Sequence, residues 1–141
     1  MKAKILILGL ICLLMIGCVL PMQKKEIKYW RELFTEPYET IYIFMKDRTF
    51  FGFSGQDETK VYMSMPLLEK RLKSFKDENY KIEDIAVIIH NHLKGHTFSP
   101  ADKKLYWRLK SKKYGFKGRF LLYSHTTNKV YDIEDKKKDL T

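Results

Sequence analysis

Residues 85–102 read IAVIIHNHLKGHTFSPAD, an aliphatic run that leads through two histidines and a glycine loop into a helix start. The run Ile85–Ile89 has no polar alternation, which predicts a strand buried on both faces. His90 and His92 follow it two residues apart, so their side chains should share one face, with Cα atoms about 6.5–7 Å apart. The tetrapeptide Ser-Pro-Ala-Asp at 99–102 then predicts a helix that continues through Leu109.

His90, His92 and Asp102 together offer two imidazole nitrogens and a carboxylate. Asp102 falls in the first helical turn, from which it can face back toward the end of the strand. Two His and one Asp leave a fourth coordination position open for water, which is typical of catalytic rather than structural zinc. Two plainer interpretations stay open. Ser-Pro-Ala-Asp is also an ordinary helix start, and the paired histidines are also compatible with two polar residues at a strand end. The order of strand, His-x-His, glycine loop, Ser and Asp favours the metal site.

This order resembles the JAB/MPN (JAMM) metalloprotease domain, in particular its prokaryotic RadC-like and JAB branches. The pattern of that family is His-x-His-Pro, a short Gly-containing loop and Ser-x-x-Asp, with a Glu upstream. His90, His92, Ser99 and Asp102 match its residues, and the resemblance covers about residues 25 to 135. Leu93 stands where the family has Pro, and the loop to Ser99 is one residue shorter.

The resemblance implies a role for each matched residue. His90, His92 and Asp102 would hold Zn²⁺, and Ser99 would donate a hydrogen bond to the developing oxyanion. The family's Glu opens a strand before the first turn, which assigns Glu39 as general base, with Glu36 as a nearby alternative. The reaction implied is hydrolysis of a peptide or isopeptide bond by metal-activated water, without a covalent intermediate. His96, in the loop, is interpreted as exposed, and His125 receives no role.

The remaining pattern predicts one α+β domain in residues 27–135, a mixed sheet flanked by helices. For this domain the resemblance implies the JAB/MPN, cytidine-deaminase-like metalloprotease fold. Apolar residues at helical spacing favour a core-facing helix that Pro37 ends and a second helix with Leu67, Leu68, Leu72 and Phe75 inward. We expect strands at 40–45, 49–53, 59–63, 82–89, 119–124 and 130–133 and helices at 27–36, 66–79 and 100–109.

The first 18 residues have the features of an export signal. Two lysines precede an apolar run that ends at Gly17 and Cys18, and the run is shorter than the roughly 20 residues that span a bilayer. Residues 14–18 resemble the lipobox of bacterial lipoproteins, which implies cleavage after Gly17, lipidation of Cys18 and a linker over 18–26. An uncleaved anchor helix is the alternative. Both predict a membrane-tethered protein of the cell envelope, facing the periplasm or the exterior.

Charge and cysteine content narrow the partners. The chain carries a net charge of +10 and only two cysteines, Cys12 and Cys18, so a mature domain would contain no disulfide. The charge is spread along helices and in the basic tail 136–141, which favours a solvated face or attraction to a membrane or wall polymer. Motifs of base-reading proteins are missing, so we expect no nucleic-acid partner.

Three functions remain open from the sequence. The first is a membrane-tethered zinc metallopeptidase that acts on a peptide or isopeptide substrate. The second is a non-catalytic envelope binding or assembly lipoprotein on the same fold, in which Leu93 and the shorter loop reflect a decayed site. The third is a RadC-like, DNA-associated role, which the export signal disfavours.

Overall fold

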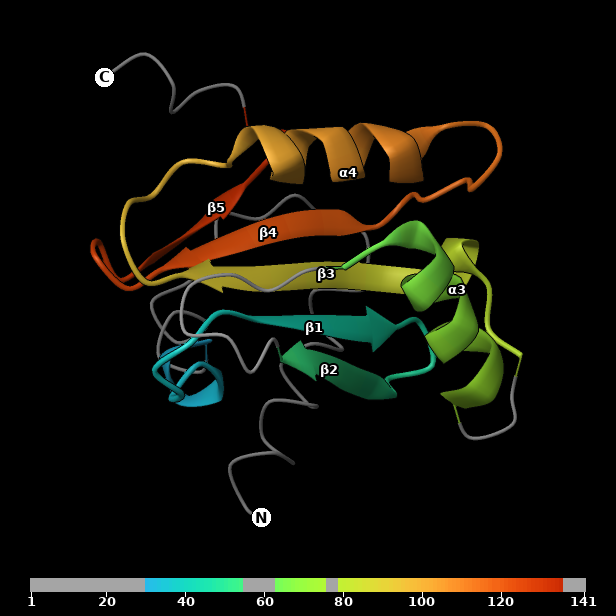
Figure 1. Ribbon diagram of the computed structural model, residues 1–141, viewed down its shortest axis with the longest axis horizontal. Coiled ribbons are helices and arrows are strands. Elements are labelled where there is room, and N and C mark those ends of the chain that lie inside the picture. Colours follow the sequence, from blue (N-terminus) through green and yellow to red (C-terminus); the bar gives the residue numbers. More distant parts are fainter. Residues whose placement is uncertain (1–29, 55–62, 76–78, 136–141) are drawn as a thin grey trace.

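A mixed five-stranded sheet forms the centre of the protein. The computed structural model describes residues 30–54, 63–75 and 79–135. The strands are β1 (Thr40–Met45), β2 (Phe50–Ser54), β3 (Ile85–His92), β4 (Arg119–Ser124) and β5 (Lys129–Asp132). They lie in the order β2-β1-β3-β4-β5. The helices are α3 (Met65–Ser74), α4 (Pro100–Lys110) and the 3₁₀ helix η2 (Ile82–Asp84). The expected α+β class with a mixed sheet is therefore confirmed (Figure 1).

The connections explain the strand directions. β1 and β2 form an antiparallel hairpin through the turn 46–48, and β4 and β5 form another in which Asn128 has a φ of 55°. β3 also pairs antiparallel with β1, but parallel with β4. Parallel neighbours need a crossover connection, and α4 forms it. As a result, four ends of elements lie at the same end of the sheet. β1 and α4 begin there, and β3 and β4 end there (Figure 1).

Apolar side chains cover both faces of the sheet. On one face, α3 and α4 pack through residues such as Leu68 and Leu109 against Ile43, Ile88 and Phe120. On the other face, Trp30 of the helical segment 30–33 and Phe34, the residue after this segment, pack against a second cluster of strand residues. The central strand β3 is thus buried on both sides, which is why its sequence is an uninterrupted aliphatic run.

Several details of the expected fold are wrong. α3 ends at Ser74 rather than at residue 79, because Phe75 already has an extended backbone with a ψ of 112°, and the first helical segment ends at residue 33 rather than at 36. Residues 82–84 form η2 rather than strand, because the Asp84 carboxylate accepts a hydrogen bond from the Lys81 N–H at 2.8 Å and closes a local turn. Leu67 does not face inward but is 39% exposed, because Leu68 and Leu72, four residues apart, define the buried stripe of α3.

Some expectations lie outside the described residues. These are the leader 1–17, Cys18, the linker 18–26, most of the strand at 59–63 and the tail 136–141. Within the described parts of the chain, no helix is both long and apolar enough to cross a membrane.

Candidate metal centre

Two histidine side chains meet at the carboxyl end of β3. His90 lies opposite Ile41 of β1 and Leu122 of β4, and it is only 3% exposed. The ring centroids of His90 and His92 are 5.0 Å apart. Residues two apart on a strand share a face, and these two rings project toward the layer that contains α4.

Asp102 approaches this pair from the first turn of α4. Its Oδ1 lies 3.2 Å from Nε2 of His90, and its Oδ2 lies 3.3 Å from Nε2 of His92. One ligand atom from each of the three residues lies within 4.8 Å of the other two. The structure therefore brings the three predicted ligands together, and the group could hold a metal ion.

An unsatisfied nitrogen supports this interpretation. Nε2 of His90 is buried and makes no hydrogen bond among the described residues, although it lies at ion-pair distance from Asp102. Buried polar atoms nearly always have a partner. The Nε2 atom of His90 faces a carboxylate oxygen of Asp102, but the angle between them does not suit a hydrogen bond. The ring of His92 lies beside it. This arrangement suits a bound cation, which would accept a lone pair from each of the three residues. The N, N, O donor set fits zinc and similar borderline cations.

The surroundings of Asp102 and His92 favour the charged form of each residue when no cation is bound. Burial alone would raise the pKa of Asp102, but contacts with the two imidazoles and the Ser99 N–H hold it far below its ordinary range. Burial opposes a charge on His92, yet its interactions with Asp102, with a smaller contribution from Glu39, raise the pKa of His92 overall. The carboxylate is thus ionised and ready to bind a cation.

Ser99 and Asp102 also form a capping box, as the plainer interpretation of their tetrapeptide predicts. The Ser99 hydroxyl accepts a hydrogen bond from the Asp102 N–H at 3.1 Å, and Asp102 Oδ2 accepts one from the Ser99 N–H at 2.7 Å. These bonds fix the carboxylate against the helix end. The helix-start and metal-ligand interpretations are therefore compatible, because Oδ2 of Asp102 can accept the capping hydrogen bond while both of its carboxylate oxygens face the histidines.

The loop between β3 and α4 is attached to the end of β4. The Ser124 hydroxyl donates to the Gly95 carbonyl at 2.6 Å, and the Gly95 N–H donates to Oγ1 of Thr126 at 3.1 Å. Phe98 packs against the rings of His90 and Phe120. Gly95 has a φ of 81°, a conformation that glycine adopts without strain. The loop thereby has a defined path although Leu93 replaces the proline of the family pattern.

Glu39 lies near the histidine pair. It directly precedes β1, whose pairing with β3 begins at Ile41 and His90. Its carboxylate contributes to raising the pKa of His92. Glu36 instead acts on Tyr42, which packs on the opposite face. Glu39 is therefore the better placed of the two glutamates.

Comparisons with known proteins identify no relative. The chain matches no protein-family model, and searches of curated proteins and of solved structures gave no significant match.

The sequence interpretation missed Asn91 and His125. Asn91 is fully buried on the face opposite the histidines. Its side chain accepts a hydrogen bond from the Thr40 N–H at 2.6 Å, donates to the Tyr38 carbonyl at 3.3 Å and lies 2.9 Å from Nε2 of His125. A signal was present in the pattern. A residue between two same-face histidines must point into the opposite core, where an amide requires partners.

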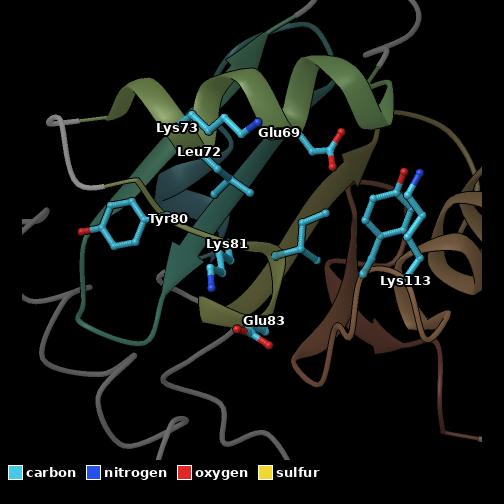
Figure 2. A pocket seen from close by; sticks show the side chains of 9 residues that line it. Glu69, Leu72, Lys73, Tyr80, Lys81, Glu83 and Lys113 are labelled. Carbon is cyan, nitrogen blue, oxygen red and sulfur yellow. The ribbon is translucent and has the colours of Figure 1, made fainter.

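A hollow elsewhere on the described surface shares no residue with the metal-ligand group. It encloses about 240 Å³ between α3, η2 and the loop after α4, and Lys73, Lys81, Lys113, Glu69 and Glu83 contribute to its lining. Figure 2 shows these charged side chains around the apolar Leu72. The hollow is open and mixed in charge, so it defines no chemistry, and we assign the candidate site to the histidine–aspartate group.

Proposed function

We propose that this protein is a zinc-dependent hydrolase of the JAB/MPN type that cleaves peptide or isopeptide bonds. The observation that carries the proposal is the convergence of His90, His92 and Asp102 with the unsatisfied Nε2 of His90. The position of Glu39 beside this group and the match in residue order add support. Three protein ligands leave room for a water molecule, as in catalytic zinc sites.

The side chains around the group would divide the reaction between them. Zinc bound there would supply Lewis-acid activation of water. Glu39 would accept a proton from the attacking water and deliver it to the nitrogen of the leaving amine as the C–N bond breaks. The Ser99 hydroxyl uses its oxygen in the helix cap, so its hydrogen would be available to the developing oxyanion. Such a donor contributes roughly 3–4 kcal/mol. The products would be a carboxylate and an amine.

Metal analysis tests the site itself. The purified full chain should hold about one zinc ion, and His90→Ala and Asp102→Ala should each lose it. His96→Ala is the matched control, because His96 is an exposed loop histidine outside the ligand group. A wild-type protein without affinity for zinc would end the proposal.

Hydrolysis assays separate a peptidase from a zinc-binding module without activity. Glu39→Gln should keep the metal and lose cleavage of peptide and isopeptide substrates, whereas Glu36→Gln should retain both. If Glu39→Gln cleaves as fast as the wild type, Glu39 is not the base. If zinc binds but no peptide or isopeptide bond is cleaved, the hydrolase proposal fails and a binding or assembly role replaces it.

A further inference from the structure

The Asn91 side chain connects three segments behind the metal-ligand group. It is 0% exposed and contacts the backbone on both sides of Glu39, through Tyr38 and Thr40, as well as the His125 ring. His125 in turn donates its backbone N–H to the carbonyl of His92 at 3.1 Å. Asn91 therefore links the segment that precedes β1 with the ends of β3 and β4.

The chemistry of its partners fixes the orientation of the amide. The Thr40 N–H can only donate, so it must meet the Asn91 oxygen. The Tyr38 carbonyl can only accept, so it must meet the amide nitrogen. The second hydrogen of that nitrogen is then directed at Nε2 of His125. Burial lowers the pKa of His125, which agrees with a neutral ring that accepts at Nε2. All the hydrogen-bonding capacity of the amide nitrogen is used.

We propose that Asn91 is the positioning residue for Glu39, an inference that rests on the proposed function. The pairing of β1 with β3 begins only at Ile41 and His90, two residues beyond Glu39. Asn91 extends the attachment past that point, because one side-chain amide holds the residue before Glu39 and the residue after it. The peptide that carries Glu39 is thereby fixed relative to β3, the strand that carries His90 and His92. Misplacing a catalytic group by 1 Å can reduce a rate about 100-fold, so such an attachment matters.

The experiment uses the full-length protein loaded with Co²⁺ and needs no substrate. The visible spectrum of bound Co²⁺ and its pH profile report the charges around the metal. Glu39→Gln removes a negative charge and should shift the midpoint of the profile to lower pH. Asn91→Ala should shift it in the same direction by at least about half as much, and the double variant should shift it no further than Glu39→Gln alone. Affinity for Co²⁺ should fall by less than about tenfold, the usual minimum when the support of a metal ligand is removed.

Three further variants separate positioning from general stability. Asn91→Ser adds no charge and keeps a hydroxyl that can accept from the Thr40 N–H, so it should give a smaller shift than Asn91→Ala, and it is the deciding variant if Asn91→Ala does not fold. His125→Ala leaves both backbone contacts and should shift the profile least. Leu121→Ala is the matched control. Leu121 is a fully buried residue in the cluster on the face opposite the histidines, so it should lower stability without moving the profile.

The outcomes distinguish this inference from the proposed function. If Glu39→Gln moves the profile and the Asn91 variants do not, Asn91 has no positioning role and the metal site stands. If the double variant moves the profile further than Glu39→Gln, Asn91 acts by another route and the inference is overturned. If the wild-type protein binds no Co²⁺, or Glu39→Gln leaves the profile unchanged, the proposed function fails first and the inference fails with it.

Discussion

Asp102 has two structural roles that depend on one ionised carboxylate. It completes the helix cap with Ser99, and it faces both imidazoles at 3.2 and 3.3 Å. The positive end of the helix dipole and the capping N–H both favour its charged form. The folding of α4 therefore prepares the carboxylate for a cation whether or not one is present.

The coupling between Asp102 and His92 can be measured in the metal-free protein. Asp102→Asn should lower the pKa of His92, because the neutral amide no longer stabilises the imidazolium while burial still opposes it. NMR titration of the His92 ring checks this. Asp84→Asn, a change in η2, is the control and should leave the pKa of His92 unchanged.

The same shift sets a pH dependence for the stability of the metal-free protein. The raised pKa of His92 contributes stability that is fully present below the unfolded value of about 6.5 and is lost as the pH rises through the folded value. Over that window, Asp102→Asn should lose less stability with rising pH than the wild type, as urea titrations would show. An equal slope in both proteins would contradict the coupling.

At the scale of the elements, the two helices begin in the same way but only one of them carries a proposed ligand. Ser64 caps α3 and Ser99 caps α4, each by accepting a hydrogen bond from a backbone N–H in the first turn. Pro stands in the first turn of both helices, where its missing N–H has no cost. Comparing the two capping serines therefore separates the contribution of a cap to the stability of the protein from its effect on the candidate site.

Loss of either cap should destabilise the protein by about 1 kcal/mol. Ser99→Ala should also weaken zinc binding, because the backbone around Asp102 is then held less firmly, whereas Ser64→Ala should not. Urea unfolding and zinc titration of both variants measure the two effects. Equal zinc affinities in the two variants would show that the cap does not support the ligand.

The junction of β3 and β4 depends on a glycine. A Cβ at Gly118 would lie 2.4 Å from the Ala86 carbonyl oxygen, a backbone atom that cannot move away without disturbing the sheet. Gly118→Ala should therefore destabilise the protein by about 1–3 kcal/mol. Gly52→Ala is the control, because its Cβ would meet the end of the Tyr42 ring at 3.1 Å, and a side chain can shift. Thermal unfolding of both variants measures the difference, and an equal effect would contradict the argument from backbone contact.

At the scale of the whole molecule, the topology concentrates the candidate site at one edge of the sheet. Antiparallel β1 starts there, parallel β3 and β4 end there, and the crossover sets the N-terminus of α4 above them (Figure 1). The two histidines lie in β3 and Asp102 lies in α4, while Glu39 directly precedes β1 and Ser99 directly precedes α4. A cation bound to the group would connect β3 directly to α4, so metal binding and global stability should be coupled.

Zinc should therefore raise the unfolding temperature of the whole domain. A free concentration 100 times the dissociation constant adds about 2.7 kcal/mol, which corresponds to roughly 10 °C for a domain of this size. Calorimetry with zinc and then with excess chelator tests the gain and its reversal. His92→Ala should show neither effect, and a similar gain in that variant would mean that zinc binds elsewhere.

Much of this architecture could be predicted because its signals are local. The aliphatic run before His90 predicts a buried strand, the Ser-Pro-Ala-Asp tetrapeptide predicts the start of α4, and strand parity places both histidines on one face. These features depend on hydrogen bonds and side-chain periods within a few residues. The sequence alone thereby determined the candidate ligands and the local geometry of each.

Only the tertiary structure decided how these pieces meet. It brought Glu39, rather than Glu36, close enough to influence the pKa of His92, and it turned Leu67 outward because Leu68 and Leu72 occupy the core. It also gave Asn91 its partners at Tyr38, Thr40 and His125. Those contacts join residues that are separated by 34 to 53 positions in the sequence, and no local pattern carries information over such separations. Strand order and register arise from the packing of both faces at once, so they exist only in the folded molecule.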